Sequence, residues 1–317
     1  MMKIVILDAS PLDKDGGISW ERIQALGEVT IYPRTSADQV VERIQQAEVV
    51  LTNKVVLDEA ILSQCPTLKH IAVMATGFNI IDGAYAKSKG ITVSNIPAYS
   101  TDAVAQQTFA LILGLTNHLH HHSEFVRSND WAKHEDFAFW HQPVYDLKGK
   151  TLGLYGFGTI AQEVAKIALA FGMEVIAHRR SDKTIEGVRL VSLDELLAAS
   201  DILSLHAPLT AENKDLFGTE SFSKMKKSAL LINTARGPLI DEMALAKALN
   251  RGEIAGAGLD VMCQEPPQLD HPLYKIEQCL ISPHMAWASV ESRLRLMDIL
   301  EANIKAYAKG EPQNIVN

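Results

Sequence analysis

The stretch Thr151–Ala161, TLGLYGFGTIA, decides the fold, because an apolar strand runs into a glycine-rich turn that opens the helix QEVAKIALAF. Gly156 permits the tight turn, Gly158 lets the backbone approach a pyrophosphate, and Ala161 allows close packing of the helix on the strand. The phosphate would bind to N–H groups at the helix N-terminus. A glycine-rich turn without a ligand is the alternative, and the strand and helix on either side favour a dinucleotide site.

Apolar runs alternate with helix-length amphipathic stretches on both sides of this motif. A continuous apolar run such as KIVIL at Lys3–Leu7 is typical of a parallel strand covered on both faces. Further strands are expected at 29–32, 49–52, 71–74 and 92–93, and then in TLGLYGFG, MEVIAH, ILSLHAPL, ALLINTA, IAGAGLDV and CLISPH. This alternation predicts an α/β fold with parallel sheets.

The length of 317 residues is enough for about two domains. The six strands that start at Thr151 make one complete doubly wound domain. We therefore predict a dinucleotide-binding Rossmann domain at residues 99–284, inserted into a second doubly wound domain of flavodoxin-like type made of residues 1–98 plus 285–317. Helices are expected at Ala37–Ala47, from Ser100 to His121 and at Ser289–Gly310.

Composition excludes several classes of protein. Hydrophobic residues make up 47% of the chain and charged residues 21%, as in ordinary globular proteins. The formal net charge of -8 argues against non-specific binding to nucleic acid or to an anionic membrane. The N-terminus MMKIVILDAS lacks a signal-peptide core, and no apolar run is long enough to span a bilayer. Cys65, Cys263 and Cys279 form no CxxC pair, so we expect a cytoplasmic protein without structural disulfides or zinc.

The end of the second strand of the dinucleotide unit bears on the choice of cofactor. An NAD enzyme places an acidic residue there for the ribose 2′-hydroxyl, about 20 residues beyond the glycines. This chain has Arg179, Arg180 and Ser181 instead. Two guanidinium groups and a hydroxyl suit a 2′-phosphate, so we predict NADP(H) as the preferred cofactor, with NAD(H) also possible. A solvated Arg-Arg loop with relaxed NAD/NADP use is the alternative.

Three ionisable residues follow consecutive predicted strands of the same domain: Arg236, Glu265 and His284. The carboxyl ends of parallel strands are where open α/β sheets bind ligands. Arginine binds a carboxylate and polarises a neighbouring carbonyl, histidine transfers a proton, and glutamate fixes the histidine tautomer. With a nicotinamide cofactor, this set predicts reduction of a 2-keto acid or the reverse oxidation. Taken singly, each residue also has a structural reading, as a surface ion pair, a loop residue or a hydrogen-bonded histidine.

These motifs resemble the D-isomer-specific 2-hydroxyacid dehydrogenase family over essentially the whole chain. The resemblance rests on GFGTIA, LHAPLT, NTARGPLID, AGAGLDVMCQEPP and SPHMAWAS. The order Arg236, Glu265 and His284, at separations of 29 and 19 residues, also matches the family. The resemblance implies that Arg236 binds the substrate carboxylate, Glu265 orients the histidine and His284 is the acid/base. A loop with the sequence MATGFN resembles the family's substrate-carboxylate loop, with backbone N–H groups of Thr76 and Gly77 as donors.

The cofactor contacts expected from the motifs and the resemblance together form one larger set. It includes Asp260 near the nicotinamide carboxamide, and His206 and Thr234 along the cofactor. The full set is Gly156, Gly158, Thr159, Ile160, Ala161, Arg179, Arg180, Ser181, His206, Thr234, Asp260, His284 and Ala286. The chain departs from the NAD-using members of the family in lacking the ribose-binding acid.

The aromatic segment Trp131–Trp140, together with Trp287, resembles the corresponding sequence of glycerate dehydrogenases, also called hydroxypyruvate or glyoxylate reductases. That subfamily implies transfer of hydride from NAD(P)H to hydroxypyruvate or glyoxylate, giving D-glycerate or glycolate. A lactate-type or phosphoglycerate-type dehydrogenase and a non-enzymatic, dinucleotide-sensing corepressor-like protein are the alternatives. The resemblance further implies a homodimer formed through the long helix near Thr101 and its flanks.

A cluster of histidines, His118, His120, His121 and His122, raises the question of a metal site. Only residues three or four apart share one face of a helix, and no carboxylate or cysteine completes a ligand set nearby. Such runs are usually a solvated helix end, so we expect no bound metal.

Overall fold

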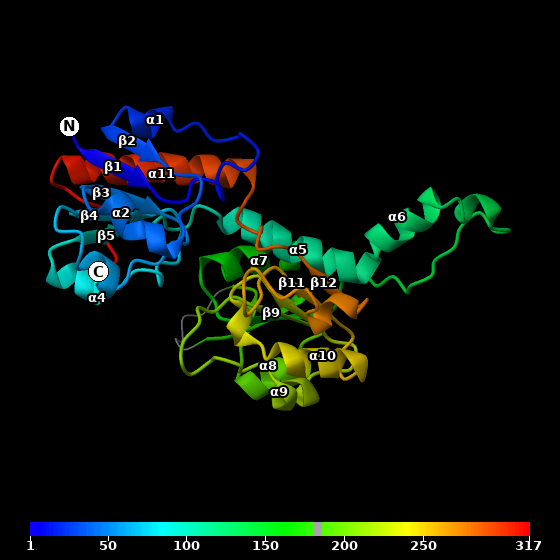
Figure 1. Ribbon diagram of the computed structural model, residues 1–317. Helices are drawn as coiled ribbons and strands as arrows, with labels where there is room; N and C mark the ends of the chain where they lie inside the picture. Colours follow the sequence, from blue (N-terminus) through cyan, green and yellow to red (C-terminus); the bar gives the residue numbers. More distant parts are fainter. Residues whose placement is uncertain (180–185) are drawn as a thin grey trace. The chain divides into compact units, whose positions relative to one another are not determined.

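The computed structural model describes residues 1–179 and 186–317. It divides into two compact units, the first made of Met1–Ser100 with Ala288–Asn317 and the second of Thr101–Trp287. Each unit has one parallel sheet with helices packed on it (Figure 1). The prediction of an α/β fold with two parallel sheets is confirmed.

The sheet of the first unit contains five strands within the described residues, in the order β2-β1-β3-β4-β5. This is the strand order of flavodoxin-like proteins. β3 and β4 are buried along their whole length, as expected for inner strands covered on both faces. The strands are β1 (Lys3–Ile6), β2 (Glu28–Ile31), β3 (Val49–Thr52), β4 (His70–Val73) and β5 (Thr92–Ser94).

The helices of this unit are short except for the last one. α11 (Val290–Ala308) packs on β4, where the ring of Tyr307 stacks on His70 with centroids 4.6 Å apart. The others are α1 (Glu21–Gln24), the 3-10 turn η1 (Ala37–Gln39), α2 (Val40–Ile44), α3 (Glu59–Leu62) and α4 (Gly83–Ser88).

The sheet of the second unit runs in the order β12-β11-β10-β9-β6-β7-β8 over the part of the chain that is described. The chain starts in the middle of this sheet at β6, extends to β8 on one side and then returns to β9 on the other. Ligands of doubly wound sheets bind at this reversal, beyond the carboxyl ends of the strands. The strands are β6 (Thr151–Tyr155), β7 (Glu174–His178), β8 (Val188–Leu190), β9 (Ile202–Leu205), β10 (Leu230–Asn233), β11 (Gly256–Leu259) and β12 (Cys279–Ile281).

Helices cover both faces of this second sheet. α5 (Thr101–Asn117) and α7 (Thr159–Ala170) bury Ala105, Phe109 and Val164 against one face. α8 (Leu193–Ala199), α9 (Thr219–Lys224) and α10 (Glu242–Asn250) pack on the other, as Figure 1 shows. Short 3-10 turns η3 (Gly237–Leu239) and η4 (Pro272–Lys275) follow β10 and precede β12.

The structure corrects three details of the predicted elements. The long helix does not continue to His121: it ends at Asn117, His118 adopts a left-handed conformation with φ of 47°, and α6 (Leu119–Arg127) begins. Leu115 and Thr116 near the end of α5 are buried, whereas no residue of α6 is buried. The helix axis therefore changes where the chain leaves the hydrophobic core. The helix expected at 37–47 is divided into η1 and α2, and β8 is an additional edge strand.

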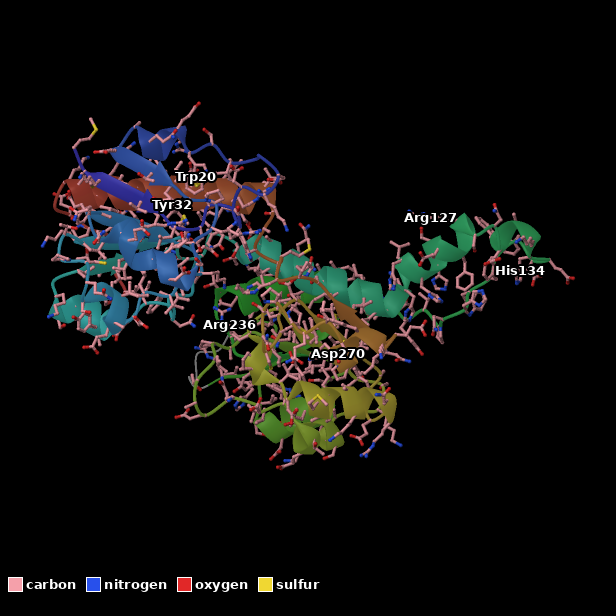
Figure 2. All side chains as sticks on the ribbon, viewed as in Figure 1. Trp20, Tyr32, Arg127, His134, Arg236 and Asp270 are labelled. Atoms are coloured by element: carbon pink, nitrogen blue, oxygen red, sulfur yellow. The ribbon has the colours of Figure 1, made fainter. Side chains whose placement is uncertain are left out.

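A segment of the second unit extends away from its sheet. Figure 2 shows Arg127 of α6 and His134, just after η2 (Trp131–Lys133), on this segment and far from Arg236. Trp131, Phe137 and Trp140 are exposed on it. Among the described residues, no helix is long and apolar enough to cross a membrane.

Candidate functional site

The glycine-rich turn after β6 has the backbone that the sequence motif requires. Gly156 has a φ of +86°, and a Cβ added there would lie 2.8 Å from the backbone nitrogen of Ala207. Its N–H donates to the carbonyl of His178 at 2.9 Å, which ties the turn to the end of β7. Glycine is therefore required at this position, both for its conformation and for its size.

Gly158, two residues on, borders open space in front of a helix. Its backbone is extended, and no heavy atom of the described residues lies within 4 Å of an added Cβ. α7 begins at the next residue, and Gly158, as its N-cap, has no side chain to occupy the first N–H groups. Ala161, in the first turn, is fully buried in the core below. A helix start without a side-chain cap, next to open space at Gly158, fits the pyrophosphate of a dinucleotide.

The residues predicted to contact a 2′-phosphate lie at the end of β7. Arg179 follows this strand directly and is half-buried. Arg180 and Ser181 fall within residues 180–185 and so lie outside the described residues. The preceding His178 stacks on Tyr155 with ring centroids 5.9 Å apart, which packs the ends of β6 and β7 together.

His206 and Thr234 follow β9 and β10 at the same edge of the sheet. Nε2 of His206 is hydrogen-bonded to the Ser204 hydroxyl at 2.8 Å. Burial lowers the pKa of His206 to about 4. It is therefore neutral near pH 7. Thr234 is buried, with its hydroxyl 3.1 Å from that of Thr108 on α5. Their role as cofactor contacts stays a prediction.

His284 and Glu265 meet at the ends of two neighbouring strands. Nδ1 of His284 lies 2.6 Å from Oε2 of Glu265. The side chains are 29% and 35% exposed, so both are accessible to a small ligand. The other carboxylate oxygen of Glu265 accepts from the N–H of Met262 at 3.0 Å. The backbone of its own loop thus holds the Glu265 carboxylate and directs it towards the imidazole of His284.

The backbone of His284 is strained and held by several contacts. Its φ is +51°, in the left-handed region, and its N–H donates to the carbonyl of Asp260 at 2.8 Å. The buried carboxylate of Asp260 accepts from the Ser282 hydroxyl at 2.5 Å and from the N–H groups of Met285 at 3.0 Å and Ala286 at 2.9 Å. Strain of this kind persists only where the surroundings over-determine it.

Burial raises the pKa of Asp260, although its hydrogen bonds act in the opposite direction. The contacts on both sides of His284 end on this one side chain. Ser282 is also bound by Gln107 of α5, whose Nε2 donates to the hydroxyl at 3.0 Å. Asp260 therefore fixes the loop that carries the imidazole, a role in the structure that is separate from any contact with a cofactor.

Arg236 follows β10, the strand next to β11. Its side chain is exposed, and Nη1 donates to the carbonyl of Ala235 at 2.6 Å. Asn233 holds the loop by donating to the carbonyl of Arg236 at 2.8 Å and accepting from the N–H of Ala235 at 3.0 Å. A Cβ added to Gly237 would lie 2.0 Å from the carbonyl carbon of Met262. The Arg236 loop and the Glu265 loop are therefore packed backbone against backbone.

Thr76 and Gly77 belong to the first unit, where they follow β4. The Thr76 hydroxyl donates to the carbonyl of Ile96 at 2.8 Å, and Asn95 donates to the Thr76 carbonyl at 2.8 Å. These bonds hold the loop in place. Binding of a substrate carboxylate by this loop stays a prediction.

Sequence reasoning missed Asp8, which organises the neighbouring loop of the first unit. Its buried carboxylate accepts from the N–H groups of Asn53 at 2.8 Å and Lys54 at 2.6 Å. Burial raises the pKa of Asp8, against these hydrogen bonds. The signal was present in the sequence, since a carboxylate directly follows the strand KIVIL.

No group of three or more metal-ligating side chains occurs within residues 1–179 and 186–317. The predicted histidine cluster lies around the junction of α5 and α6, where Nδ1 of His121 is 3.8 Å from a carboxylate oxygen of Glu277.

A family model described as the D-isomer specific 2-hydroxyacid dehydrogenase NAD binding domain matches residues 109–286. The chain belongs to this family. It is an NAD(P)-dependent D-2-hydroxyacid dehydrogenase, and its matched region contains the glycine-rich turn and the His284 loop.

Relatives of this dehydrogenase match over 90% to 100% of the chain. It is 42% identical to a hydroxypyruvate reductase of Blautia hydrogenotrophica, over 100% of both chains. It is 40% identical to a glycerate dehydrogenase of Methylorubrum extorquens, over 99% of this chain and 98% of the other. A glyoxylate reductase of Thermococcus litoralis is 41% identical over 90% of this chain and 87% of its own.

Solved structures share the fold of this dehydrogenase. An acyclic imino acid reductase in complex with NADPH and D-Arg has a TM-score of 0.89 at 31% identity, with 100% of both chains covered. The NADPH-dependent glyoxylate/hydroxypyruvate reductase of Sinorhizobium meliloti, in complex with NADP and malonate, has a TM-score of 0.87 at 29% identity, with 99% of this dehydrogenase and 96% of that chain covered.

Proposed function

We propose that this dehydrogenase reduces hydroxypyruvate to D-glycerate and glyoxylate to glycolate, with NADPH preferred over NADH. The observation that carries the proposal is the 2.6 Å contact between His284 and Glu265 on the same sheet as the glycine-rich turn. Full-length relatives named hydroxypyruvate reductase and glycerate dehydrogenase support this choice of substrate.

The cofactor's part in the reaction is simple: bound NAD(P)H supplies the hydride that reduces C2 of the keto acid. The residues proposed to hold the cofactor are those of the glycine-rich turn with Arg179, His206, Thr234 and Asp260. Gly158 and the start of α7 fit the pyrophosphate, since open space borders the Gly158 Cα and the helix start supplies N–H groups without a side-chain cap.

His284 transfers the proton in the proposed reaction. Glu265 engages Nδ1, which leaves Nε2 as the ring nitrogen directed to a substrate. His284 donates a proton to the alkoxide that forms at C2. Arg236 binds the substrate carboxylate through its planar guanidinium and polarises the adjacent carbonyl. In the opposite direction, the same imidazole accepts the proton of the 2-hydroxyl group.

The remaining assignments complete the proposal. Residues 99–284 bind the dinucleotide, and residues 1–98 plus 285–317 bind the substrate, with backbone N–H groups of Thr76 and Gly77 as carboxylate donors. The protein is proposed to be a homodimer formed through α5 and its flanks. The exposed aromatic residues Trp131, Phe137 and Trp140 beyond α6 support this surface, because large exposed apolar patches mark interfaces.

Initial rates on a panel of 2-keto acids with both cofactors test the function. Hydroxypyruvate and glyoxylate should have the highest kcat/KM, and His284→Ala should lower it by on the order of 1,000-fold, as for loss of a general acid. A His284→Ala enzyme within about threefold of wild type would refute the proposal. Turnover of no keto acid, together with partner binding that depends on NAD(H), would instead support a corepressor-like protein.

A further inference from the structure

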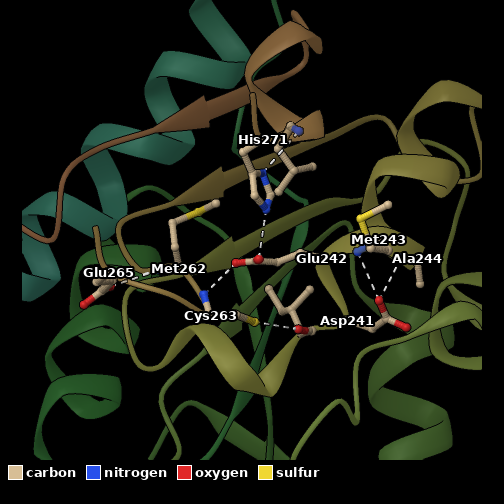
Figure 3. Close-up of polar contacts among 10 residues, drawn as sticks. Asp241, Glu242, Met243, Ala244, Met262, Cys263, Glu265 and His271 are labelled. Carbon is tan, nitrogen blue, oxygen red and sulfur yellow. Dashed lines mark hydrogen bonds and ion pairs between the residues drawn. The ribbon is translucent and has the colours of Figure 1, made fainter. Parts of the chain in front are cut away.

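A second polar pair, Glu242 and His271, lies behind the loop that carries Glu265 (Figure 3). Nε2 of His271 is 3.1 Å from Oε2 of Glu242. The two side chains are only 13% and 12% exposed, far less than the Glu265 and His284 side chains. Burying an ionisable pair is costly unless its hydrogen bonds are satisfied, so its contacts indicate what it does.

Glu242 binds the backbone of the Glu265 loop. Its Oε1 accepts from the N–H of Cys263 at 2.7 Å, while Glu265 accepts from the preceding N–H, that of Met262, at 3.0 Å. Two successive N–H groups are thus taken by two different carboxylates, as Figure 3 shows. The Sγ atom of Cys263 donates to the carbonyl of Ile240 at 3.5 Å, which adds a second tie to the same segment.

His271 is oriented so that it donates to Glu242. Its Nδ1 accepts from the N–H of Leu273 at 3.4 Å at the start of η4, so the proton is on Nε2. Glu242 is the first residue of α10, where the helix dipole favours a negative charge, and Asp241 caps this helix through the N–H groups of Met243 and Ala244.

The thiol of Cys263 stays protonated beside the Glu242 carboxylate. Partial desolvation and the Glu242 carboxylate raise the pKa of Cys263 to about 12, so the sulfur remains a thiol donor. Asp215 and Asp241 also face this region and add negative charge to it. On the other side, the absence of a side chain at Gly237 brings the Arg236 loop against the same Met262–Cys263 backbone.

We infer that Glu242, oriented by His271, is a positioning residue for the reaction: it anchors the Met262–Cys263 backbone and thereby aligns Glu265 on His284. The inference rests on the proposed function, in which His284 transfers the proton. Glu242 touches neither His284 nor any group assigned to the cofactor among the described residues, so its effect passes through the Met262–Cys263 backbone that it anchors.

The test is a double-mutant cycle between Glu242→Gln and Glu265→Gln. The amide oxygen of the Glu242→Gln variant can still accept from Cys263, but its NH₂ group then faces the Nε2–H of His271. We expect kcat for hydroxypyruvate to fall on the order of 10- to 100-fold, as for other groups that orient a catalytic residue. KM for NADPH should change less than about twofold, as in Glu265→Gln.

On the Glu265→Gln background, Glu242→Gln should cost almost nothing more, because the two residues act in series. Fully additive losses would overturn the inference, as would a raised KM for NADPH with unchanged kcat. Glu220→Gln, on the exposed first turn of α9, is the matched control and should leave kcat and both KM values unchanged.

Two variants of His271 separate positioning from mere packing. His271→Gln keeps a donor for Glu242 and should retain most activity, whereas His271→Leu should behave like Glu242→Gln. Equal losses in both would contradict the assignment. Imidazole ¹⁵N shifts of His284 provide a readout without turnover: the Nδ1 signal should change in Glu242→Gln and not in Glu220→Gln. If wild type reduces no keto acid, the proposed function fails, while an unchanged Nδ1 signal defeats the positioning role itself.

Discussion

His284 and Glu265 lie beyond neighbouring strands of one sheet and are in contact, with Nδ1 2.6 Å from Oε2. The contact fixes which ring nitrogen is engaged and places a negative charge beside the imidazole. The backbone at His284 is held in the left-handed region by the carbonyl of Asp260. The geometry of the pair therefore depends on residues outside it.

Replacing Glu265 by Gln should lower kcat for keto-acid reduction. The amide can turn its NH₂ group towards Nδ1 of His284, so the ring loses the acceptor that fixes its tautomer and orientation. We expect kcat to be lower on the order of 10-fold, with KM for NADPH changed less than about twofold. Initial rates of hydroxypyruvate reduction check this. Wild-type kcat in the variant would show that Glu265 does not orient the proton donor.

Asp260→Asn should damage the His284 loop. The carboxylate accepts from Ser282, Met285 and Ala286, and an amide would place its own NH₂ against one of these donors. We expect a loss in kcat/KM on the order of 100-fold and a lower Tm, since a buried group left unpaired costs about 1–3 kcal/mol. Ser282→Ala is the control and should cost about 1 kcal/mol in unfolding free energy. Wild-type kcat in Asp260→Asn would contradict this role.

The cofactor prediction concerns Arg179. Wild type should have a lower KM for NADPH than for NADH, and Arg179→Asp should erase or reverse this order by removing a cation and adding a repelling carboxylate. Arg189→Gln, on the exposed face of β8 where Arg189 pairs with Glu195, should change neither KM. Equal KM values for the two cofactors in wild type would refute the argument.

His70 should make the protein less stable in acid. Burial lowers the pKa of His70 to about 4, from the usual 6.5, and its ring nitrogens contact the hydroxyls of Thr92 and Ser94. The unfolded chain takes up a proton below pH 6.5 and the folded one does not, so stability is full above pH 6.5 and falls as the pH drops towards 4. The shift corresponds to about 3 kcal/mol.

His70→Gln should flatten this dependence, because glutamine keeps polar contacts without titrating. Urea unfolding at about pH 7.5 and about pH 4.5, on either side of the free-histidine pKa, measures it as the difference between wild type and variant. His206 also has its pKa lowered to about 4 by burial, so wild-type minus variant isolates His70. An identical acid loss in both proteins would rule out His70 as the cause.

Much of the fold could be predicted from periodicity because its strands are long apolar runs. β3 and β9 are buried at every position, which is why they stand out in the sequence. β8 was missed because it is short, half-buried and carries an outward Arg189. The break at His118 depends on where the core ends, and local sequence does not contain that information.

Some residues of the candidate site could be predicted from the sequence, and others meet only through tertiary packing. Residues that follow strands, such as Arg236 and His284, could be proposed from strand-end positions, and their roles stay predictions. Glu242 and His271 could not, since they lie 29 residues apart and meet only through the packing of α10 against the chain before β12. Asp260 was expected near the cofactor from the resemblance, whereas its hold on the His284 loop depends on tertiary contacts.

Gly237 has a practical consequence for attempts to change the substrate range. A Cβ added at Gly237 would lie 2.0 Å from the backbone of Met262. Any other residue would therefore push apart the two loops that carry the proposed reactive groups Arg236 and Glu265. Libraries that randomise this position should return glycine almost alone among active clones. The exposed side chain of Met285, the residue after His284, bears no such constraint and is a better target for altered selectivity.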